Sequence, residues 1–253
     1  MKSGKFILKI EKNSRSPWDG YSVHPVVANI DLGLSGRGFN IAEQGESYDW
    51  DFRWEKSLFC NSSLFFNLYL NKCTKGVVDF SIAIGINSWE FTEAENHLKV
   101  WECLKNPQFG LSGESAHAAN VVRVPLSFLL LNGTPPVERL TWKSGLTDFA
   151  KVAEVVLQDF VAYGEPFLAT IDSLPMLIRF LQNMGAKKGV RSVNASLAAA
   201  IYLFHAGEKD AALVELKYGF DAAIRKAQSV NRDAEAIQAL NCKYERYKNY
   251  LLG

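Results

Sequence analysis

The fold is decided by residues 64–86, which read LFFNLYLNKCTKGVVDFSIAIGI. Apolar residues occupy every second position from Leu64 to Leu70 and again from Val78 to Ile86, whereas the link between the two runs is polar. A period of two is typical of strands that bury one face. Two such strands joined by a short polar link predict an antiparallel hairpin, whose apolar face must be covered by other parts of the chain.

The hairpin is expected to belong to a larger sheet, because other early segments also carry strand patterns. Residues 5–12 alternate, residues 50–55 alternate Trp or Phe with charged residues, and residues 121–131 form an apolar run. The glycine-rich segment Gly33–Gly38 predicts a turn between two strands of this sheet. One helix is expected within this region, since Thr92 and Glu95 have the spacing of a capping box.

From residue 147 onward the apolar spacing changes to 3.6 residues, the period of an amphipathic helix. It predicts five helices, and the third and fourth have the layout of one tetratricopeptide-type hairpin, with Gly207 at the bend. A single hairpin is not an array, because such repeats bury their faces only in about three or more copies. The predicted fold class is α+β: an antiparallel sheet half with one helix over residues 1–142, and a helical half over residues 143–253. The two halves could form one continuous globular unit.

Charge and composition exclude several classes of protein. The 253 residues carry a formal net charge of +1, and both halves are near neutral, with 13 basic and 12 acidic side chains in residues 145–253. A nucleic-acid-binding protein would concentrate positive charge, so no nucleic-acid partner is expected. No apolar run is long enough to span a membrane, and residues 1–5 do not lead into a signal peptide. We therefore expect a cytoplasmic protein with no membrane partner.

The four cysteines give no sign of a metal site. Cys60, Cys73, Cys103 and Cys242 contain no C-x-x-C pair, which structural zinc sites use. In a protein without an export signal, the simplest expectation is that all four are reduced thiols packed as small hydrophobic residues.

Three segments resemble catalytic or phosphate-binding motifs but fail at defining positions. Residues 33–38 have their glycines in the order G-x-x-G-x-G, and residues 185–192 place the second glycine one position too early for a phosphate loop. Gly113–His117 lacks the final glycine of a nucleophile elbow. Ser115 and His117 could belong to a triad only if the fold assembles one. We predict no catalytic residue, no cofactor and no metal ion from these patterns.

One acidic and aromatic segment stands out as a candidate partner-binding surface. Carboxylates beside large aromatic side chains combine charge complementarity with the anchors that dominate interface energetics. The segment lacks the spacing of a calcium loop. The predicted surface consists of Glu43, Glu46, Tyr48, Asp49, Trp50, Asp51 and Trp54.

These observations predict a non-catalytic, cytoplasmic protein-binding module. A small protein with a curved sheet and a trailing helical bundle is similar in coarse architecture to several bacterial immunity and defence-associated proteins. An immunity protein that neutralises a toxin by occlusion is therefore the expected form of this function. Two alternatives stay open: a hydrolase-like enzyme with a site assembled near His117, and a helical adaptor that uses its C-terminal hairpin. The patterns do not fix the oligomeric state.

Overall fold

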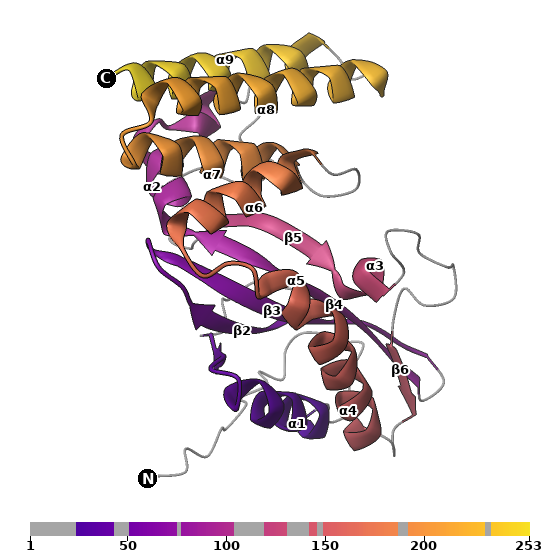
Figure 1. Cartoon of the computed structure of the whole chain (residues 1–253). Helices are drawn as coiled ribbons and strands as arrows, with labels where there is room; N and C mark the ends of the chain where they lie inside the picture. Colours follow the sequence, from indigo (N-terminus) through magenta and orange to yellow (C-terminus); the bar gives the residue numbers. More distant parts are fainter. Residues whose placement is uncertain are drawn as a thin grey trace.

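The computed structural model shows an antiparallel sheet with helices on one face and a stack of helices beyond its upper edge (Figure 1). The described residues are 24–42, 51–74, 77–103, 119–130, 142–145, 149–186, 192–230 and 234–253. Within them, no helix combines the length and apolar character needed to cross a bilayer. The architecture confirms the α+β fold class.

The sheet has six strands in the order β1-β2-β3-β4-β5, with β6 also pairing with β4. All pairings are antiparallel, and the long β3–β4 hairpin at the centre confirms the prediction from the alternating residues. β5 pairs with residues 83–88 of β4, and β6 pairs with residues 77–80 of the same strand. β6 therefore lies in line with β5 along β4. The strands are β1 Asn40–Ile41, β2 Asp51–Ser57, β3 Ser62–Thr74, β4 Val77–Ser88, β5 Ala119–Pro125 and β6 Trp142–Gly145.

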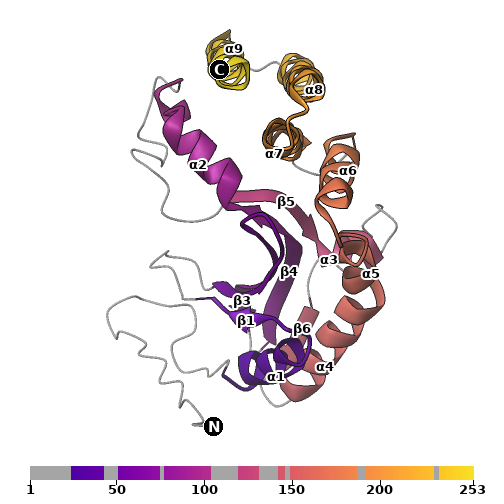
Figure 2. The same ribbon diagram turned by 60° about the vertical axis from the view of Figure 1, so that its left-hand side comes forward.

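The helices of the second half follow the predicted pattern, and α6 to α9 stack one after another away from the sheet (Figure 2). Gly207, at a φ of 83°, makes the bend between α7 and α8. The helical segments are α1 His24–Ser35, α2 Trp89–His97, the 3₁₀ turn η1 Val100–Cys103, α3 Leu126–Leu130, α4 Phe149–Asp159, the π-helical turn η2 Phe160–Gly164, α5 Glu165–Leu168, α6 Leu174–Ala186, α7 Ser192–His205, α8 Lys209–Ser229 and α9 Ala234–Leu252.

Three local predictions are wrong. The glycine-rich segment does not join two strands, since residues 33–35 complete α1 and residues 36–38 form the turn that leads into β1. Its missing side chain has a packing role, because a Cβ there would lie 2.3 Å from a methyl group of Leu157 on α4. The helix expected at Thr92 begins earlier, with Ser88 as its N-cap. The strand expected over residues 121–131 ends at Pro125 and gives way to α3.

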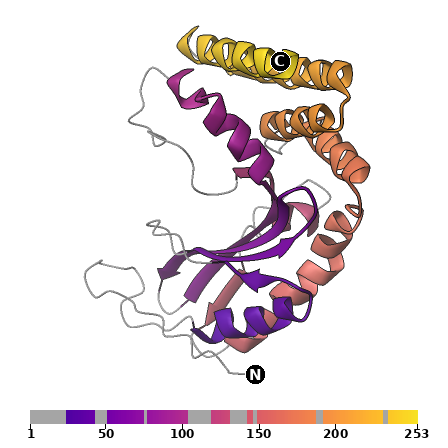
Figure 3. The same cartoon turned by 90° about the vertical axis from the view of Figure 1, so that its left-hand side faces the viewer.

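One apolar core lies between the sheet and the helices α1 and α4, which run side by side beneath it (Figure 3). Trp54, Phe66 and Phe160 meet edge to face, with ring centroids 5.8 and 5.2 Å apart. The indole Nε1 of Trp54 donates a hydrogen bond to Asp31 on α1 at 2.8 Å. The same core continues into α6, α7 and α9, so the sheet and the helical half share it.

The last helix, α9, is fixed to the segment that follows β4. Tyr247 stacks on Phe91 of α2, with ring centroids 6.5 Å apart, and Lys243 pairs with Glu95. Arg246 closes the end of this segment by donating to the Leu98 carbonyl oxygen at 2.7 Å. A helix that is distant in sequence therefore holds the α2–η1 segment in place.

A disulfide between Cys103 of η1 and Cys242 of α9 completes this attachment, with a Cα–Cα distance of 5.7 Å. The expectation that all four cysteines are reduced is wrong for this pair. The sequence did not reveal this disulfide because its two cysteines are 139 residues apart, whereas cysteine spacing identifies only local motifs. Cys60 is a free, exposed thiol, and Cys73 lies in β3.

Tyr202 is expected to make the protein less stable at alkaline pH. Its side chain is 1% exposed, and its hydroxyl lies 2.8 Å from the Ser88 hydroxyl. Burial, which disfavours the charged form, raises its pKa from 10.0 to about 12. An unfolded tyrosine ionises near pH 10 while the folded one keeps its proton. The stabilisation is therefore complete below pH 10 and falls by about 2–3 kcal/mol between pH 10 and 12.

Urea unfolding at pH 9 and pH 12 measures this loss. Burial also raises the pKa of Tyr247, so the wild-type loss includes both side chains. Tyr202→Phe should weaken the pH dependence, whereas Tyr218→Phe, at a side chain that is 44% exposed, should leave it unchanged. An unchanged dependence in Tyr202→Phe would contradict the assignment.

Candidate functional site

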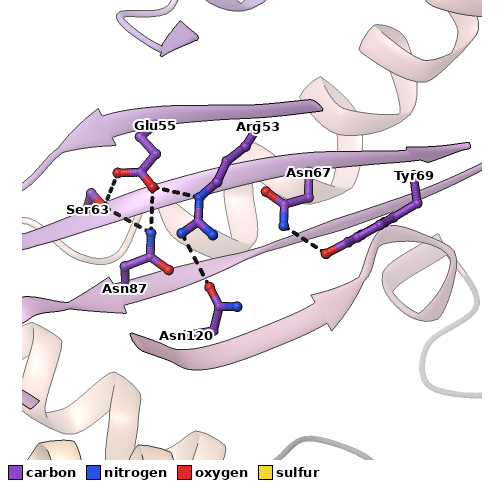
Figure 4. A network of polar contacts seen from close by, with 7 residues as sticks. All are labelled: Arg53, Glu55, Ser63, Asn67, Tyr69, Asn87 and Asn120. Atoms are coloured by element: carbon purple, nitrogen blue, oxygen red, sulfur yellow. Dashed lines mark hydrogen bonds and ion pairs between the residues drawn. The ribbon is translucent and has the colours of Figure 1, made fainter. Parts of the chain in front are cut away.

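The face of the sheet opposite the core carries a group of polar side chains from four adjacent strands (Figure 4). Strand alternation places them there, since the residues between them, such as Phe52, Phe66 and Ile84, belong to the core. We call this surface the polar face. It consists of Arg53, Glu55, Ser63, Asn67, Tyr69, Asn87, Asn120 and Arg123.

The carboxylate of Glu55 is the centre of the hydrogen-bond network. Its Oε1 accepts from Arg53 Nε at 2.6 Å and from Asn87 Nδ2 at 3.0 Å, while its Oε2 accepts from Ser63 Oγ at 3.0 Å. Arg53 also donates through Nη2 to Asn120 Oδ1 at 3.3 Å, which links β2 to β5 (Figure 4). The network therefore spans four strands and fixes the charged groups in place.

Two arginines lie against aromatic rings on this face. The guanidinium carbon of Arg53 is 4.9 Å from the centroid of the Phe65 ring, and that of Arg123 is 4.7 Å from the centroid of Tyr69. β4 makes room for these side chains with Ala83 and Gly85. A Cβ on Gly85 would lie 1.9 Å from the Val122 carbonyl oxygen and 2.8 Å from the Phe65 ring, so only glycine fits there.

Two buried amide oxygens on the polar face have no hydrogen-bond partner among the described residues. Asn67 is 5% exposed and Asn87 is fully buried, and the Oδ1 atom of each is unpaired. Their amide nitrogens are paired, since Asn67 Nδ2 donates to the Tyr69 hydroxyl at 2.7 Å and Asn87 Nδ2 to Glu55. An unpaired buried carbonyl costs about 1–3 kcal/mol, so these two asparagines lower the stability of the sheet instead of adding to it.

The predicted acidic and aromatic surface is only partly described. Glu43, Glu46, Tyr48, Asp49 and Trp50 lie outside the described residues, and Asp51 pairs with Tyr69 at the end of β2. Trp54 is 0% exposed and belongs to the core, so it is not an exposed anchor, which corrects its place in the predicted surface. Two polar-face residues that this prediction did not include, Arg53 and Glu55, lie on the face of the same strand opposite Trp54.

The residues of the catalytic alternative cannot be placed, because Ser115 and His117 lie outside the described residues. Most of the basic connector that resembles a phosphate loop also lies outside them, between the end of α6 and the start of α7. Among the residues that the structure describes, no group of three or more His, Cys, Asp or Glu side chains is arranged to hold a metal ion.

Away from the polar face, a cavity of about 300 Å³ opens between α2, α7 and α9 and is lined by Glu90, Glu93, His97, His205 and Tyr250. His205 Nδ1 lies 3.2 Å from the Glu90 carboxylate, which also accepts from Asn61. Burial and the two nearby carboxylates raise the pKa of Tyr250. Because Glu90 already has partners, this cavity is a weaker candidate than the polar face, where buried acceptors are unpaired.

Comparison with known proteins adds no assignment, since no protein family, curated protein or solved structure matches the chain. The polar face is therefore a candidate functional site on the basis of its geometry alone. It offers fixed donors on two arginines and fixed acceptors on Glu55 and the two asparagines, which is the chemistry of a recognition surface.

Proposed function

We propose that this chain is a binding protein that captures a partner protein on the polar face of its sheet. The observation that carries the proposal is the pair of buried, unpaired amide oxygens of Asn67 and Asn87 inside an otherwise bonded network. A sheet that needed only to fold would be more stable with apolar residues at these positions. Polar groups that cost stability and lie in a fixed array are typical of sites built for a ligand.

The residue types also favour a protein partner. Tyr and Arg are enriched among the residues that dominate protein–protein interfaces, and Tyr69, Arg53 and Arg123 supply them here. Arg53 and Glu55 keep 26% and 32% of their side-chain surface exposed, whereas Asn67 and Asn87 are buried between strands. The buried asparagines are therefore surrounded by partly exposed charged side chains. A partner protein that covers these charged side chains would exclude the remaining water from them.

Photo-crosslinking tests this proposal. Tyr69 is replaced with p-benzoylphenylalanine. The protein is then irradiated in an extract of the cells that naturally produce it. We expect one adduct of defined mass, and we expect excess wild-type protein, but not the Arg53→Ala/Arg123→Ala variant, to compete for it. The same replacement at Tyr218, which is 44% exposed on α8, is the matched control and should give no such adduct.

Two results would refute the proposal: the absence of an adduct at position 69, or an adduct for which the double variant competes as well as the wild type. An adduct at position 218 alone would instead support a helical adaptor.

The immunity function is a narrower form of this proposal, in which the captured partner is a toxin. A cytoplasmic location is proposed on the sequence alone, and the Cys103–Cys242 disulfide bears on it, since such bonds persist mainly in oxidising compartments. Labelling of free thiols immediately after cell lysis would show whether this pair is oxidised in the cell.

A further inference from the structure

The helix α8 buries one of its faces and exposes the other. It lies between α7 and α9 in the helical stack and packs on both of them (Figure 2). The buried positions are Ala212, Glu215, Leu216, Gly219, Phe220, Ala223 and Ala227. The opposite face of the helix forms a row of side chains that we call the α8 stripe, and it consists of Asp210, Val214, Lys217, Tyr218, Asp221 and Arg225.

The α8 stripe exposes two large apolar side chains one turn apart. Val214 keeps 72% of its surface exposed, and Tyr218 keeps 44%. Side chains at positions i and i+4 lie next to each other on a helix, so these two form one patch in the middle of the stripe. An exposed apolar patch with charged residues around it is typical of a surface that binds another protein.

The charged side chains of the stripe alternate in sign along the helix. Asp210 comes first, and it is followed in order by Lys217, Asp221 and Arg225. Among the residues that the structure describes, none forms a salt bridge with any of these four side chains. A partner that complements the stripe must therefore present the opposite order of charges along its own length.

A second copy of the chain presents that order when its α8 runs in the opposite direction. Asp210 and Arg225 form the two ends of the stripe, so a two-fold axis through its middle places Asp210 of one copy against Arg225 of the other. The same axis brings Lys217 of each copy within about one helical turn of Asp221 in the other. In a parallel arrangement each charge would instead meet its like.

We infer that the chain forms a weak symmetric dimer in which the α8 stripes of two copies pack against each other in opposite directions. The stripe spans about 22 Å along the helix axis, at a rise of about 1.5 Å per residue. One pair of helices of this length makes a contact at the small end of specific interfaces, so we expect a dissociation constant on the order of 10–100 µM. The inference does not depend on the proposed function, because α8 belongs to the helical stack and not to the polar face.

Sedimentation equilibrium of the full chain over a range of concentrations tests the dimer. Every sample carries Cys60→Ser, so that a disulfide between the exposed thiols of two copies does not contribute. We expect a reversible monomer–dimer equilibrium that weakens as the salt concentration rises, because opposite charges at a solvent-exposed contact are screened by salt. A chain that stays monomeric at about 1 mM, well above the expected dissociation constant, would refute the dimer.

An exchange of charges tests whether the α8 stripe is the contact. Asp210→Arg or Arg225→Asp alone should weaken the dimer about tenfold, because each puts like charges together at both ends of the symmetric contact. The double variant should regain the original affinity, since the exchanged charges again oppose each other. A mixture of the two single variants should form mixed dimers more tightly than either variant pairs with itself. Arg179→Asp makes the same charge change at an exposed position on α6 and should leave association unchanged.

Circular dichroism spectra show whether each variant is folded. A dimer that the single variants do not weaken, or that Arg179→Asp weakens equally, would overturn the assignment to α8. A double variant that stays as weak as the single ones would overturn the antiparallel arrangement. In the crosslinking experiment at position 218, a second copy gives an adduct of twice the chain mass, whereas an adduct of another mass would show a different protein on the stripe and overturn this inference.

Discussion

Trp54→Ala is expected to lower the free energy of unfolding by about 3–5 kcal/mol. The indole is fully buried and packs edge to face on Phe66, with centroids 5.8 Å apart, so its removal leaves a large cavity. It also removes the donor that Asp31 Oδ1 accepts from at 2.8 Å, and a polar group without its partner adds to the cost. Urea unfolding followed by circular dichroism measures the loss.

Trp89→Ala is the matched control, because this tryptophan is 42% exposed at the start of α2. We expect it to cost less than about 1 kcal/mol. Similar losses in the two variants would show that Trp54 is not the core residue described above. A binding test that replaces Asp49, Asp51 and Trp54 together would confuse loss of folding with loss of recognition, so Arg53 and Arg123 are the better positions.

Cys103→Ser is expected to destabilise the protein by about 3–5 kcal/mol. The disulfide closes a long loop, since 139 residues separate its two cysteines, and a cross-link of this span strongly restricts the unfolded chain. It also ties η1 to α9, next to the contacts of Lys243 and Arg246 with the α2–η1 segment. Denaturant unfolding of the oxidised wild type and of the variant measures the difference.

Cys60→Ser controls for the loss of a thiol, because Cys60 is exposed and unbonded, and it should change stability little. A reducing agent should lower the wild-type stability to that of Cys103→Ser and leave the variant unaffected. If reduction changes neither protein, the disulfide does not contribute to stability.

The strands were predictable because their information is local. Alternation along residues 64–70 and 78–86 requires only that one face be covered, and the β3–β4 hairpin has the predicted pairing. The five late helices followed in the same way from a period of 3.6. The helix α1 was missed because Gly33 and Gly36 favour a turn, while the close approach of Leu157 that makes Gly33 useful comes from a distant helix.

The candidate site was only half predictable. Alternation in residues 50–55 separated Trp54 from Arg53 and Glu55, but it did not show which side the helices cover, so the aromatic side was assigned to the surface. The remaining members of the polar face come from other strands, as in the bond from Arg53 to Asn120, 67 residues away. Such convergence depends on strand register and sheet curvature, which spacing along one strand does not reveal.

The Cys103–Cys242 bond makes a covalent ring from more than half of the chain. A protease that cuts one peptide bond anywhere between these two cysteines would open the ring without releasing either piece. The nicked protein would therefore migrate as one species on a denaturing gel until a reductant separates it into two. Damage at any point within the ring therefore leaves α9 covalently joined to the α2–η1 segment that follows β4.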